Sequence, residues 1–357
     1  MPQPSIDTLI IGQGLAGSLL AWTLIGRGRS VRVCDDHQQG SASRVAAGVL
    51  NPLAGMRFSR PAEVGGWLDS AHRLYRELER ELDRPLLHEL PMIRLLRSAE
   101  QRRFYERQAA DPASAPYLGE AFGPGDSGYR LGDAHGGFHQ RQTGYIDTSA
   151  LLDGLADWLR HRDALQMGSV KPQDIQLTPD GVRLGELTAA RVVFCEGWRL
   201  RDNPWFNWLP MQPAKGEILT LAHDPAQPDR MLAGIRWLVP LTDGRCKLGA
   251  TVEHRQLDTQ ATAQARDALL ADYQSMLPAA APAQVLNQQA GVRPNTRDRK
   301  PLLGAHPQHP ELLIFNGFGG RGSLTIPWHA ERFADWLDGR GELPDAADIR
   351  RLNADPP

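Results

Sequence analysis

The first forty residues show an apolar run, a glycine-rich turn, a helical apolar stripe and a second apolar run, in that order. The first run, residues 9–11, ends at Gly12, and the stripe over residues 18–25 has the spacing of one helix face. The chain then enters an apolar run at residues 30–34 and reaches Asp35. This order predicts a βαβ unit, in which a crossover helix joins two parallel strands.

Further along, the patterns predict helices separated by a loop-rich region. Residues 66–110 carry many charges and place apolar residues at helical spacing, which predicts a helix-forming stretch. Residues 112–144 are rich in glycine and proline, so we expect loops there, with room for short strands. A clear helical stripe covers residues 148–162, with Thr148 as the expected N-cap.

The later part of the chain is dominated by strand patterns. Residues 181–195 and 211–255 predict strands, and TDG at residues 242–244 predicts a tight turn between two of them. Another helix is expected over residues 259–276. The pattern as a whole predicts an α/β fold with a further unit attached.

The turn after the first strand has the spacing of a dinucleotide-binding motif. Gly12, Gly14 and Gly17 fit G-x-G-x-x-G: the first permits a tight turn, the second lets a pyrophosphate approach the backbone, and the third lets helix and strand pack closely. Free N–H groups at the helix N-terminus can then bind phosphate. Three glycines alone also suit a turn without a ligand, but strand, helix, strand and acid in this order favour the dinucleotide.

Two adjacent carboxylates follow the second strand. Asp35 lies about 20 residues beyond the motif, where a carboxylate can bind an adenosine ribose, and Asp36 is the competing candidate. An acid at this place favours an unphosphorylated ribose, so FAD or NAD fits better than NADP. The segment SASRVAAGVLNP follows almost at once, whereas an NAD-type unit more usually continues into another crossover helix.

That segment has little side-chain volume. Ala46, Ala47 and Gly48 let the backbone lie close to a flat ring system, and Ser43 and Arg44 can reach a pyrophosphate. A plain small-residue turn is the alternative.

Composition excludes several classes of protein. Hydrophobic residues make up 41% of the 357 residues and charged residues 23%, which is typical of a globular chain rather than a disordered or membrane-spanning one. The net charge of −2 and the lack of a dense basic cluster argue against a nucleic-acid partner. Because acidic Asp7 precedes the first apolar run, that run predicts a buried strand rather than a signal peptide.

Cysteine and histidine spacing predicts no metal site. The three cysteines lie far apart without a C-x-x-C, so neither zinc nor a disulfide framework is indicated, and we expect a reducing, cytoplasmic location. The 11 histidines show no spacing such as H-E-x-x-H.

Seven segments together carry a resemblance to a known family. In this order over nearly the whole chain, they resemble the D-amino acid oxidase superfamily of FAD-dependent oxidoreductases, in the branch that contains glycine oxidase and sarcosine oxidase. The segments are IIGQGLAGSLLAWTLIGRGRSVRVCDD, SASRVAAGVLNP, VVFCEGW, PAKGEI, WLVPLTDGRCKLGAT, GVRPNTRDRKPLLG and LLIFNGFGGRGSLTIP.

The resemblance implies a discontinuous layout. A Rossmann-like FAD-binding domain of α/β type would be interrupted by an α+β substrate domain with an antiparallel sheet. The expected FAD-binding segments are 1–75, 145–210 and 288–357, and the expected substrate-binding segments are 76–144 and 211–287.

Arg293 is the main candidate for substrate binding. It stands in AGVRPNTRDRKPLLG, a stretch that otherwise has the composition of a loop between strands. The resemblance assigns it the grip on a substrate carboxylate, and a planar guanidinium can pair with a carboxylate through two parallel hydrogen bonds. The alternative is a structural clamp on backbone carbonyls, and we expect Arg297 and Arg299 to be structural or to face solvent.

Two residues depart from the family pattern. Trp237 replaces a tyrosine that family members place over the substrate, which keeps an aromatic wall but leaves one N–H donor in place of a hydroxyl. Arg57 follows the small-residue segment. If Arg57 turned inward, it would give a second anion contact, suited to a diacid or a bulky anionic substrate; otherwise it would be a solvated loop arginine.

The resemblance also implies which residues hold FAD. Gly320, Gly322 and Ser323 would form the turn before the C-terminal helix, whose free N–H groups can stabilise negative charge on the flavin. Val170 matches a residue whose backbone contacts adenine. The full expected set is Gly12, Gly14, Leu15, Ala16, Gly17, Asp35, Asp36, Ser43, Arg44, Ala46, Ala47, Gly48, Val170, Cys195, Gly197, Gly317, Gly319, Gly320, Arg321, Gly322 and Ser323.

We therefore expect an FAD-dependent amine oxidase or dehydrogenase. The resemblance implies oxidation of the Cα–N bond of a small amino acid or N-substituted amino acid, with hydride transfer to flavin N5, an imine that hydrolyses, non-covalent FAD, and O₂ or another electron acceptor. The alternatives are an FAD-dependent 2-hydroxy-acid dehydrogenase, an amine oxidase acting on a modified tRNA nucleoside, and a flavin-binding protein without turnover. The substrate, the acceptor and the oligomeric state lie beyond these patterns.

Overall fold

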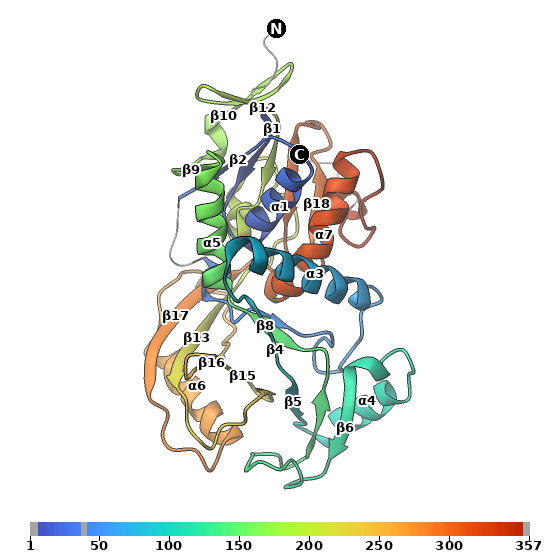
Figure 1. Cartoon of the computed structure of the whole chain (residues 1–357), viewed down its shortest axis with the longest axis vertical. Helices are drawn as coiled ribbons and strands as arrows, with labels where there is room; N and C mark the ends of the chain where they lie inside the picture. Colours follow the sequence, from blue (N-terminus) through green and yellow to red (C-terminus); the bar gives the residue numbers. More distant parts are fainter. Residues whose placement is uncertain (1–5, 37–40, 353–357) are drawn as a thin grey trace.

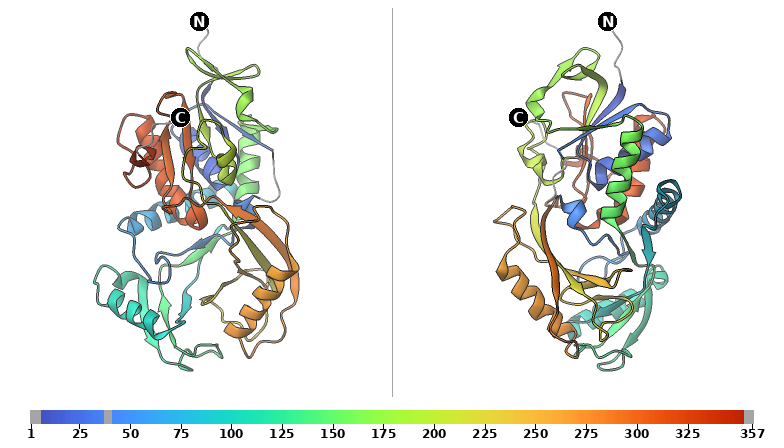
Figure 2. Two further views of the ribbon diagram at one scale, coloured as in Figure 1. Left: turned by 180° about the vertical axis from the view of Figure 1, so that it is seen from behind. Right: turned by 60° about the vertical axis from the view of Figure 1, so that its left-hand side comes forward.

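The fold is built on two large sheets at opposite ends of the molecule (Figure 1). The computed structural model describes residues 6–36 and 41–352. Both views in Figure 2 show segments from the two ends of the chain and from its middle (green) in one lobe, whereas the segments before and after that middle part (teal, and yellow to orange) form the other. This mixed α/β architecture agrees with the predicted fold class.

The first sheet contains the predicted βαβ unit. Strand β1 pairs in parallel with β2 on one side and β12 on the other, and β12 continues in parallel to β19. Parallel strands buried on both faces read as continuous apolar runs, which is the pattern of β1 and β12. Its strands are β1 (Ile6–Ile11), β2 (Val31–Asp35), β9 (Leu165–Met167), β10 (Ile175–Thr178), β11 (Gly181–Leu184), β12 (Leu187–Phe194), β18 (Leu302–Ala305) and β19 (Leu312–Asn316).

The second sheet is mostly antiparallel and has the order β17-β13-β16-β15-β14-β5-β7-β6. The predicted TDG turn joins β15 to β16, which pair antiparallel. Its strands are β5 (Met92–Leu95), β6 (Leu118–Phe122), β7 (Gly137–Gln140), β13 (Ala214–Ala222), β14 (Met231–Ala233), β15 (Trp237–Pro240), β16 (Arg245–Gly249) and β17 (Val285–Arg293).

Helices pack against the first sheet and flank the second. Helix α7 packs against α1 and α3, and the core between them includes Leu19, Leu68 and Phe333. A three-stranded sheet of β3 (Val49–Leu50), β8 (Gly144–Ile146) and β4 (Leu87–Glu89) adds to this region. The helices are α1 (Leu15–Gly26), α2 (Ala42–Val45), α3 (Val64–Leu82), α4 (Ala99–Ala109), α5 (Thr148–His161), α6 (Ala263–Met276) and α7 (Gly322–Leu337). Within the described ranges, no helix is long and apolar enough to cross a membrane.

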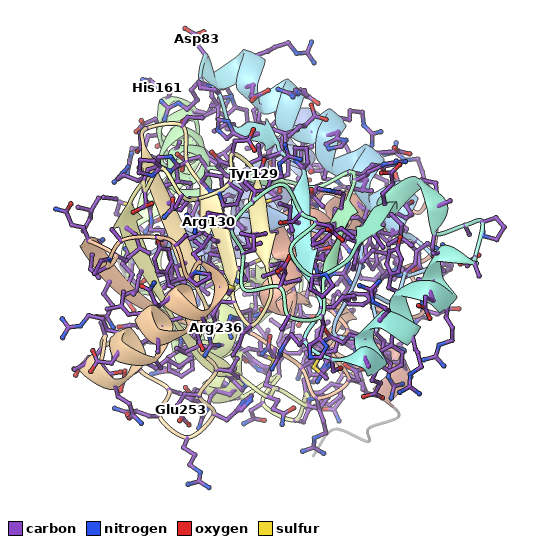
Figure 3. The ribbon with its side chains drawn as sticks, turned by 90° about the horizontal axis from the view of Figure 1, so that it is seen from below. Asp83, Tyr129, Arg130, His161, Arg236 and Glu253 are labelled. Carbon is purple, nitrogen blue, oxygen red and sulfur yellow. The ribbon has the colours of Figure 1, made fainter. Side chains whose placement is uncertain are left out.

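The helix-forming prediction for residues 66–110 was only partly right. Helix α3 ends at Leu82, its C-cap Asp83 adopts a left-handed conformation with φ 47° at the edge of the molecule (Figure 3), and α4 begins only at Ala99. Between them, β4 and β5 pair with β8, β7 and β14. Pro85 and Pro91 disfavour a continuous helix, and the partners of these strands lie far along the chain, so local spacing does not reveal them.

The N-cap of α5 is Asp147 rather than the predicted Thr148. The Asp147 carboxylate accepts a hydrogen bond from the backbone N–H of Ala150 at 2.9 Å. The Thr148 hydroxyl instead donates to the carbonyl oxygen of Ala46 at 3.1 Å. Thr148 therefore anchors the small-residue segment to α5.

The expected domain boundaries remain a proposal, with one observation that bears on them. Strand β17 pairs with β13 along its whole length and ends at Arg293, so residues 288–293 extend the antiparallel sheet. The stretch around Arg293 is thus a strand end and not the loop that its composition predicted.

His329 should make the stability of the fold depend on pH. It lies in α7 with 4% exposure, its Nδ1 is 2.8 Å from the carbonyl oxygen of Thr325, and burial lowers its pKa from 6.5 to about 4. Between pH 6.5 and pH 4 the His329 imidazole is protonated in the unfolded chain but remains neutral in the folded one. The free energy of unfolding should therefore fall by about 2 kcal/mol between pH 7 and pH 5. Urea unfolding at both pH values measures it. His329→Gln should remove most of this fall, while the exposed His161→Gln is the control; an equal fall in His329→Gln would contradict the assignment.

Candidate functional site

A cavity of about 1010 Å³ connects the two sheets. At one end it is lined by the glycine turn after β1 and by Asp35 at the end of β2. At the other end it is lined by Trp237 of β15 and Arg94 of β5. Ligands of open α/β sheets bind outside the carboxyl ends of the parallel strands, which is where the first end lies. The volume suits a large ligand.

The glycine turn has the close packing that its spacing predicted. Gly12 has φ +105°, and a Cβ added there would lie 2.7 Å from the carbonyl oxygen of Cys195. A Cβ on Gly17 would lie 1.9 Å from the carbonyl oxygen of Gly12, so Gly17 supports the turn from behind the cavity wall. Gly14 and Leu15 line the cavity, and the backbone N–H of Leu15 donates to Ser43 Oγ at 3.0 Å. These contacts fit a dinucleotide cradle.

The two candidate ribose carboxylates both line the cavity but differ in their partners. Asp35 Oδ2 accepts a hydrogen bond of 2.6 Å from the backbone N–H of Gln13, which fixes it beside the glycine turn. Asp36 forms an ion pair with Arg199 at 3.1 Å. Sequence reasoning missed Arg199, although it lies just after the motif that contains Cys195 and Gly197.

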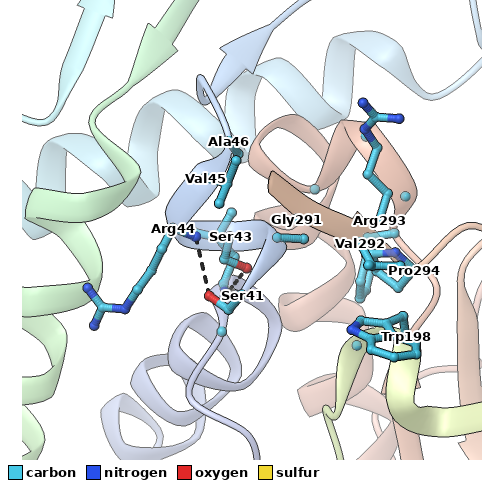
Figure 4. Close-up of a pocket in the computed structure, with 18 of the residues that line it drawn as sticks. Ser41, Ser43, Arg44, Val45, Ala46, Trp198, Gly291, Val292, Arg293 and Pro294 are labelled. Carbon is cyan, nitrogen blue, oxygen red and sulfur yellow. Dashed lines mark hydrogen bonds between the residues drawn. The ribbon is translucent and has the colours of Figure 1, made fainter. Parts of the chain in front are cut away.

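The small-residue segment is held by three other elements. The carbonyl oxygen of Ala46 accepts hydrogen bonds from Thr148 and from Lys247 Nζ, the latter at 2.9 Å, and burial lowers the pKa of Lys247. Arg44 extends toward α5 (Figure 4), where it pairs with Asp153 at 2.7 Å. A Cβ on Gly48 would lie 2.0 Å from the carbonyl oxygen of Ile146. The backbone of this segment is therefore fixed against the cavity.

Arg293 lies at the end of β17, and its guanidinium reaches across β13. Nη2 donates a hydrogen bond of 2.8 Å to the carbonyl oxygen of Thr251. A Cβ on Gly216 would lie 1.9 Å from Nη2, so the absence of a side chain at Gly216 makes room for the guanidinium. Burial, and then the nearby Arg236, lowers the pKa of Arg293.

Trp237 lines the same cavity from β15. It pairs with Gly249 of β16, where an added Cβ would lie 3.0 Å from Trp237 Cζ2. The indole therefore lies over a position without a side chain. Arg57, by contrast, is exposed and lies 5.7 Å from the ring of Phe104, so it is a surface arginine and not a second anion contact in the cavity.

The turn before α7 divides into residues that line the cavity and residues behind it. Gly319, Gly320, Gly322 and Ser323 line it. Arg321 does not: its Nη2 donates to the carbonyl oxygen of Asn51 at 3.2 Å and its guanidinium lies 5.2 Å from the ring of Trp67. Gly317, with φ +78°, also lies outside the lining residues.

Most of the predicted site residues meet at this single cavity. Besides those described above, Ala16, Ala46, Ala47, Val170, Cys195 and Gly197 line it. Burial raises the pKa of Cys195 well above its usual range, which agrees with a packing role for that thiol. The lining residues that sequence reasoning missed include Asn51, Arg94, Trp198, Arg199, Gly216 and Arg236. Arg236 could have been predicted as a site residue from its position directly before Trp237.

Comparison with known families identifies one model that covers most of the chain. The model described as FAD dependent oxidoreductase matches residues 7–336. Glycine oxidase from Pseudomonas putida is 28% identical, with 96% of this chain and 97% of that protein aligned. The tRNA 5-methylaminomethyl-2-thiouridine biosynthesis bifunctional protein MnmC from Azoarcus is also 28% identical, over 96% of this chain but only 59% of that protein.

Solved structures share the fold at lower identity. The crystal structure of glycine oxidase from Geobacillus kaustophilus has a TM-score of 0.83 and 23% identity, with 96% of this chain and 97% of that one covered. Iminodiacetate oxidase from Chelativorans has a TM-score of 0.80 and 21% identity, with 96% and 98% covered. At these identities the likeness concerns the fold.

Proposed function

Because this chain belongs to the family of FAD-dependent oxidoreductases, we propose that it oxidises the Cα–N bond of a small amino acid or N-substituted amino acid whose carboxylate binds Arg293. Within this family the chain is an FAD-dependent amine oxidase or dehydrogenase. Its similarity to glycine oxidases along nearly their whole length supports amino acid oxidation.

The cavity residues fit FAD as the cofactor. The tightly packed turn at Gly12 and Gly14 would hold the pyrophosphate, Asp35 or Asp36 the ribose, and the turn at Gly320 the flavin end. When bound, FAD supplies the acceptor for the two electrons that leave the substrate as a hydride. The protein holds the substrate in line with that acceptor and keeps water away.

The single observation that carries the proposal is that Arg293 faces the cavity without a carboxylate partner among the described residues. Five arginines among the described residues line the cavity, and Arg44, Arg199 and Arg236 each pair with a carboxylate of the protein. Arg293 is half-buried, and in the described part of the chain its only hydrogen-bond partner is a neutral carbonyl oxygen. A half-buried guanidinium without a carboxylate partner is suited to bind one from a ligand, because such charge-assisted pairs can be bidentate and strong.

The cavity favours an amine over a 2-hydroxy acid as substrate. Oxidation of a hydroxy acid needs a base to remove the hydroxyl proton, whereas a neutral amine uses its own lone pair. Over residues 6–36 and 41–352, no histidine lines the cavity. The one lysine that lines it there, Lys171, is next to Val170, which is expected to lie at the adenine end, and Lys247 is bonded to Ala46 and does not line it. Trp237 would form the aromatic wall that limits the pose of the substrate.

A modified tRNA nucleoside is the second candidate substrate. The similarity to the MnmC protein supports it, and this chain spans only 59% of that relative. The net charge of −2 speaks against it, because tRNA binding usually requires a basic surface.

Anaerobic titration of the purified holoenzyme tests the proposal. Glycine, sarcosine, D-amino acids, N-alkyl amino acids, 2-hydroxy acids and tRNA are added one at a time while the flavin absorbance is followed. We expect one class of amino acid to bleach the flavin and O₂ or a quinone to restore it. Bleaching only by hydroxy acids or only by tRNA would overturn the proposed substrate, and bleaching by none would favour a flavin-binding protein without turnover.

A further inference from the structure

A second arginine in the cavity wall also has no carboxylate partner. Of the five lining arginines, only Arg94 and Arg293 form no ion pair within the described residues. Arg94 lies on β5, far from Arg293 along the chain and on a strand contributed by a different segment. If Arg293 binds the only carboxylate of a substrate, Arg94 is left without a partner and needs another explanation.

Strand pairing places Arg94 on the same face of the sheet as Trp237. Arg94 pairs with Ala233 of β14, and Ala233 pairs with Trp237 of β15. The row continues through Gly249 to Ile218. Directly paired residues direct their side chains to one face, and all five members of this row line the cavity. Arg94, small Ala233 and Trp237 thus form a continuous stretch of cavity wall.

The interactions of Arg94 within the protein leave most of its hydrogen-bonding capacity unused. Its Nη2 donates one long hydrogen bond of 3.3 Å to the carbonyl oxygen of Gly55, and its guanidinium lies 5.0 Å from the ring centre of Phe58. A guanidinium has five N–H donors. Burial lowers the pKa of Arg94 to about 10.

The location of Arg94 combines depth with access. Arg94 is half-buried and lines the cavity, so its remaining accessible surface is available to a ligand. A partly desolvated cation without a counter-ion costs free energy, and pairing with an anion offsets that cost. Phe58 and Trp237 give the surroundings an apolar character that strengthens such a pair.

We propose that Arg94 is a second anion subsite, and that the substrate is an amino acid with a second carboxylate, carried on its side chain or on its N-substituent. This inference rests on the proposed function, in which Arg293 binds the first carboxylate beside the oxidised carbon. Arg94 would then select substrates by length and charge at the far end of the cavity. The second anion contact that the sequence suggested for Arg57 is thus assigned to Arg94.

Binding of carboxylates that cannot be oxidised tests the subsite. The holoenzyme is titrated with butyrate and with the dicarboxylates malonate, succinate, glutarate and adipate, and Kd is read from the change in flavin absorbance. We expect one dicarboxylate to bind at least about 10-fold more tightly than butyrate, because a second charge-assisted pair forms. No preference for any dicarboxylate in the wild-type protein would overturn the subsite without the need for a variant.

Variants assign the preference to the residue. Arg94→Gln should weaken binding of the best dicarboxylate by about 10- to 100-fold and leave butyrate within about 2-fold. Arg57→Gln is the matched control: it removes a nearby surface arginine and should change neither ligand. If Arg94→Gln does not fold, Arg94→Lys should weaken the dicarboxylate and not butyrate, since lysine keeps the charge but not the fork. Unchanged dicarboxylate binding in a folded Arg94 variant overturns the inference.

The anaerobic amino acid titration and the carboxylate titration together separate the two proposals. If monocarboxylate amino acids bleach the flavin but dicarboxylates show no preference, the subsite fails and the proposed function stands. If neither butyrate nor any amino acid affects the flavin, the proposed function fails and the subsite fails with it.

Discussion

Replacement of Arg293 by glutamine is expected to lower kcat/KM for the amino acid substrate by about 100-fold or more while the protein keeps its flavin. The variant would lose the proposed charge pair with the substrate carboxylate, and loss of such a pair, once the substrate covers it, costs about 2–5 kcal/mol. Because the same pair orients the α-carbon, kcat should fall as well as KM rise. Steady-state kinetics and the ratio of flavin to protein absorbance measure both effects.

Gly216 offers an independent way to test Arg293. In Gly216→Ala the new Cβ would lie 1.9 Å from Arg293 Nη2, so the guanidinium must move although its charge remains. We expect a loss in kcat/KM that disappears when Gly216→Ala is made in the Arg293→Gln background, since coupled residues are not additive. Wild-type kcat/KM in Arg293→Gln would instead identify Arg293 as a clamp on the Thr251 carbonyl.

Replacement of Gly17 by alanine is expected to abolish flavin binding and to lower the free energy of unfolding by about 3 kcal/mol. The added Cβ would lie 1.9 Å from the carbonyl oxygen of Gly12 and 3.2 Å from Cγ2 of Ile10, so α1 must move away from the turn that it supports. Urea unfolding and the flavin content of the purified protein measure the two effects.

Gly26 in the same helix provides the matched control. A Cβ on Gly26 meets no atom within 4 Å, and alanine is the better helix former by about 0.5–1 kcal/mol. Gly26→Ala should therefore keep the flavin and lose no stability. If Gly17→Ala behaved in the same way, close packing of α1 against the turn would not be required for the cofactor.

Local features of the fold were readable from the sequence. The βαβ unit, helix α5 and the turn between β15 and β16 depend on residues close together in the chain, so apolar spacing and glycine placement predicted them. Strands β4 and β5 were predicted as part of a helix, because their stability comes from β8, β7 and β14 rather than from their own residues.

At the candidate site, too, features of local sequence were predictable and features set by non-local contacts were not. The glycine turn and the two carboxylates at the end of β2 could be predicted from the sequence, since they belong to a short motif with a chemical reason for its spacing. Arg293 became a candidate through the family resemblance of its segment. Which further arginine faces the cavity depends on the folded arrangement of strands. Arg57 and Arg94 are both arginines near apolar residues in the sequence, and pairing of β5 with β14 puts Arg94 in the row of Trp237 while Arg57 stays at the surface. Non-local strand pairing sets which charges are buried without a partner, and no local pattern records it.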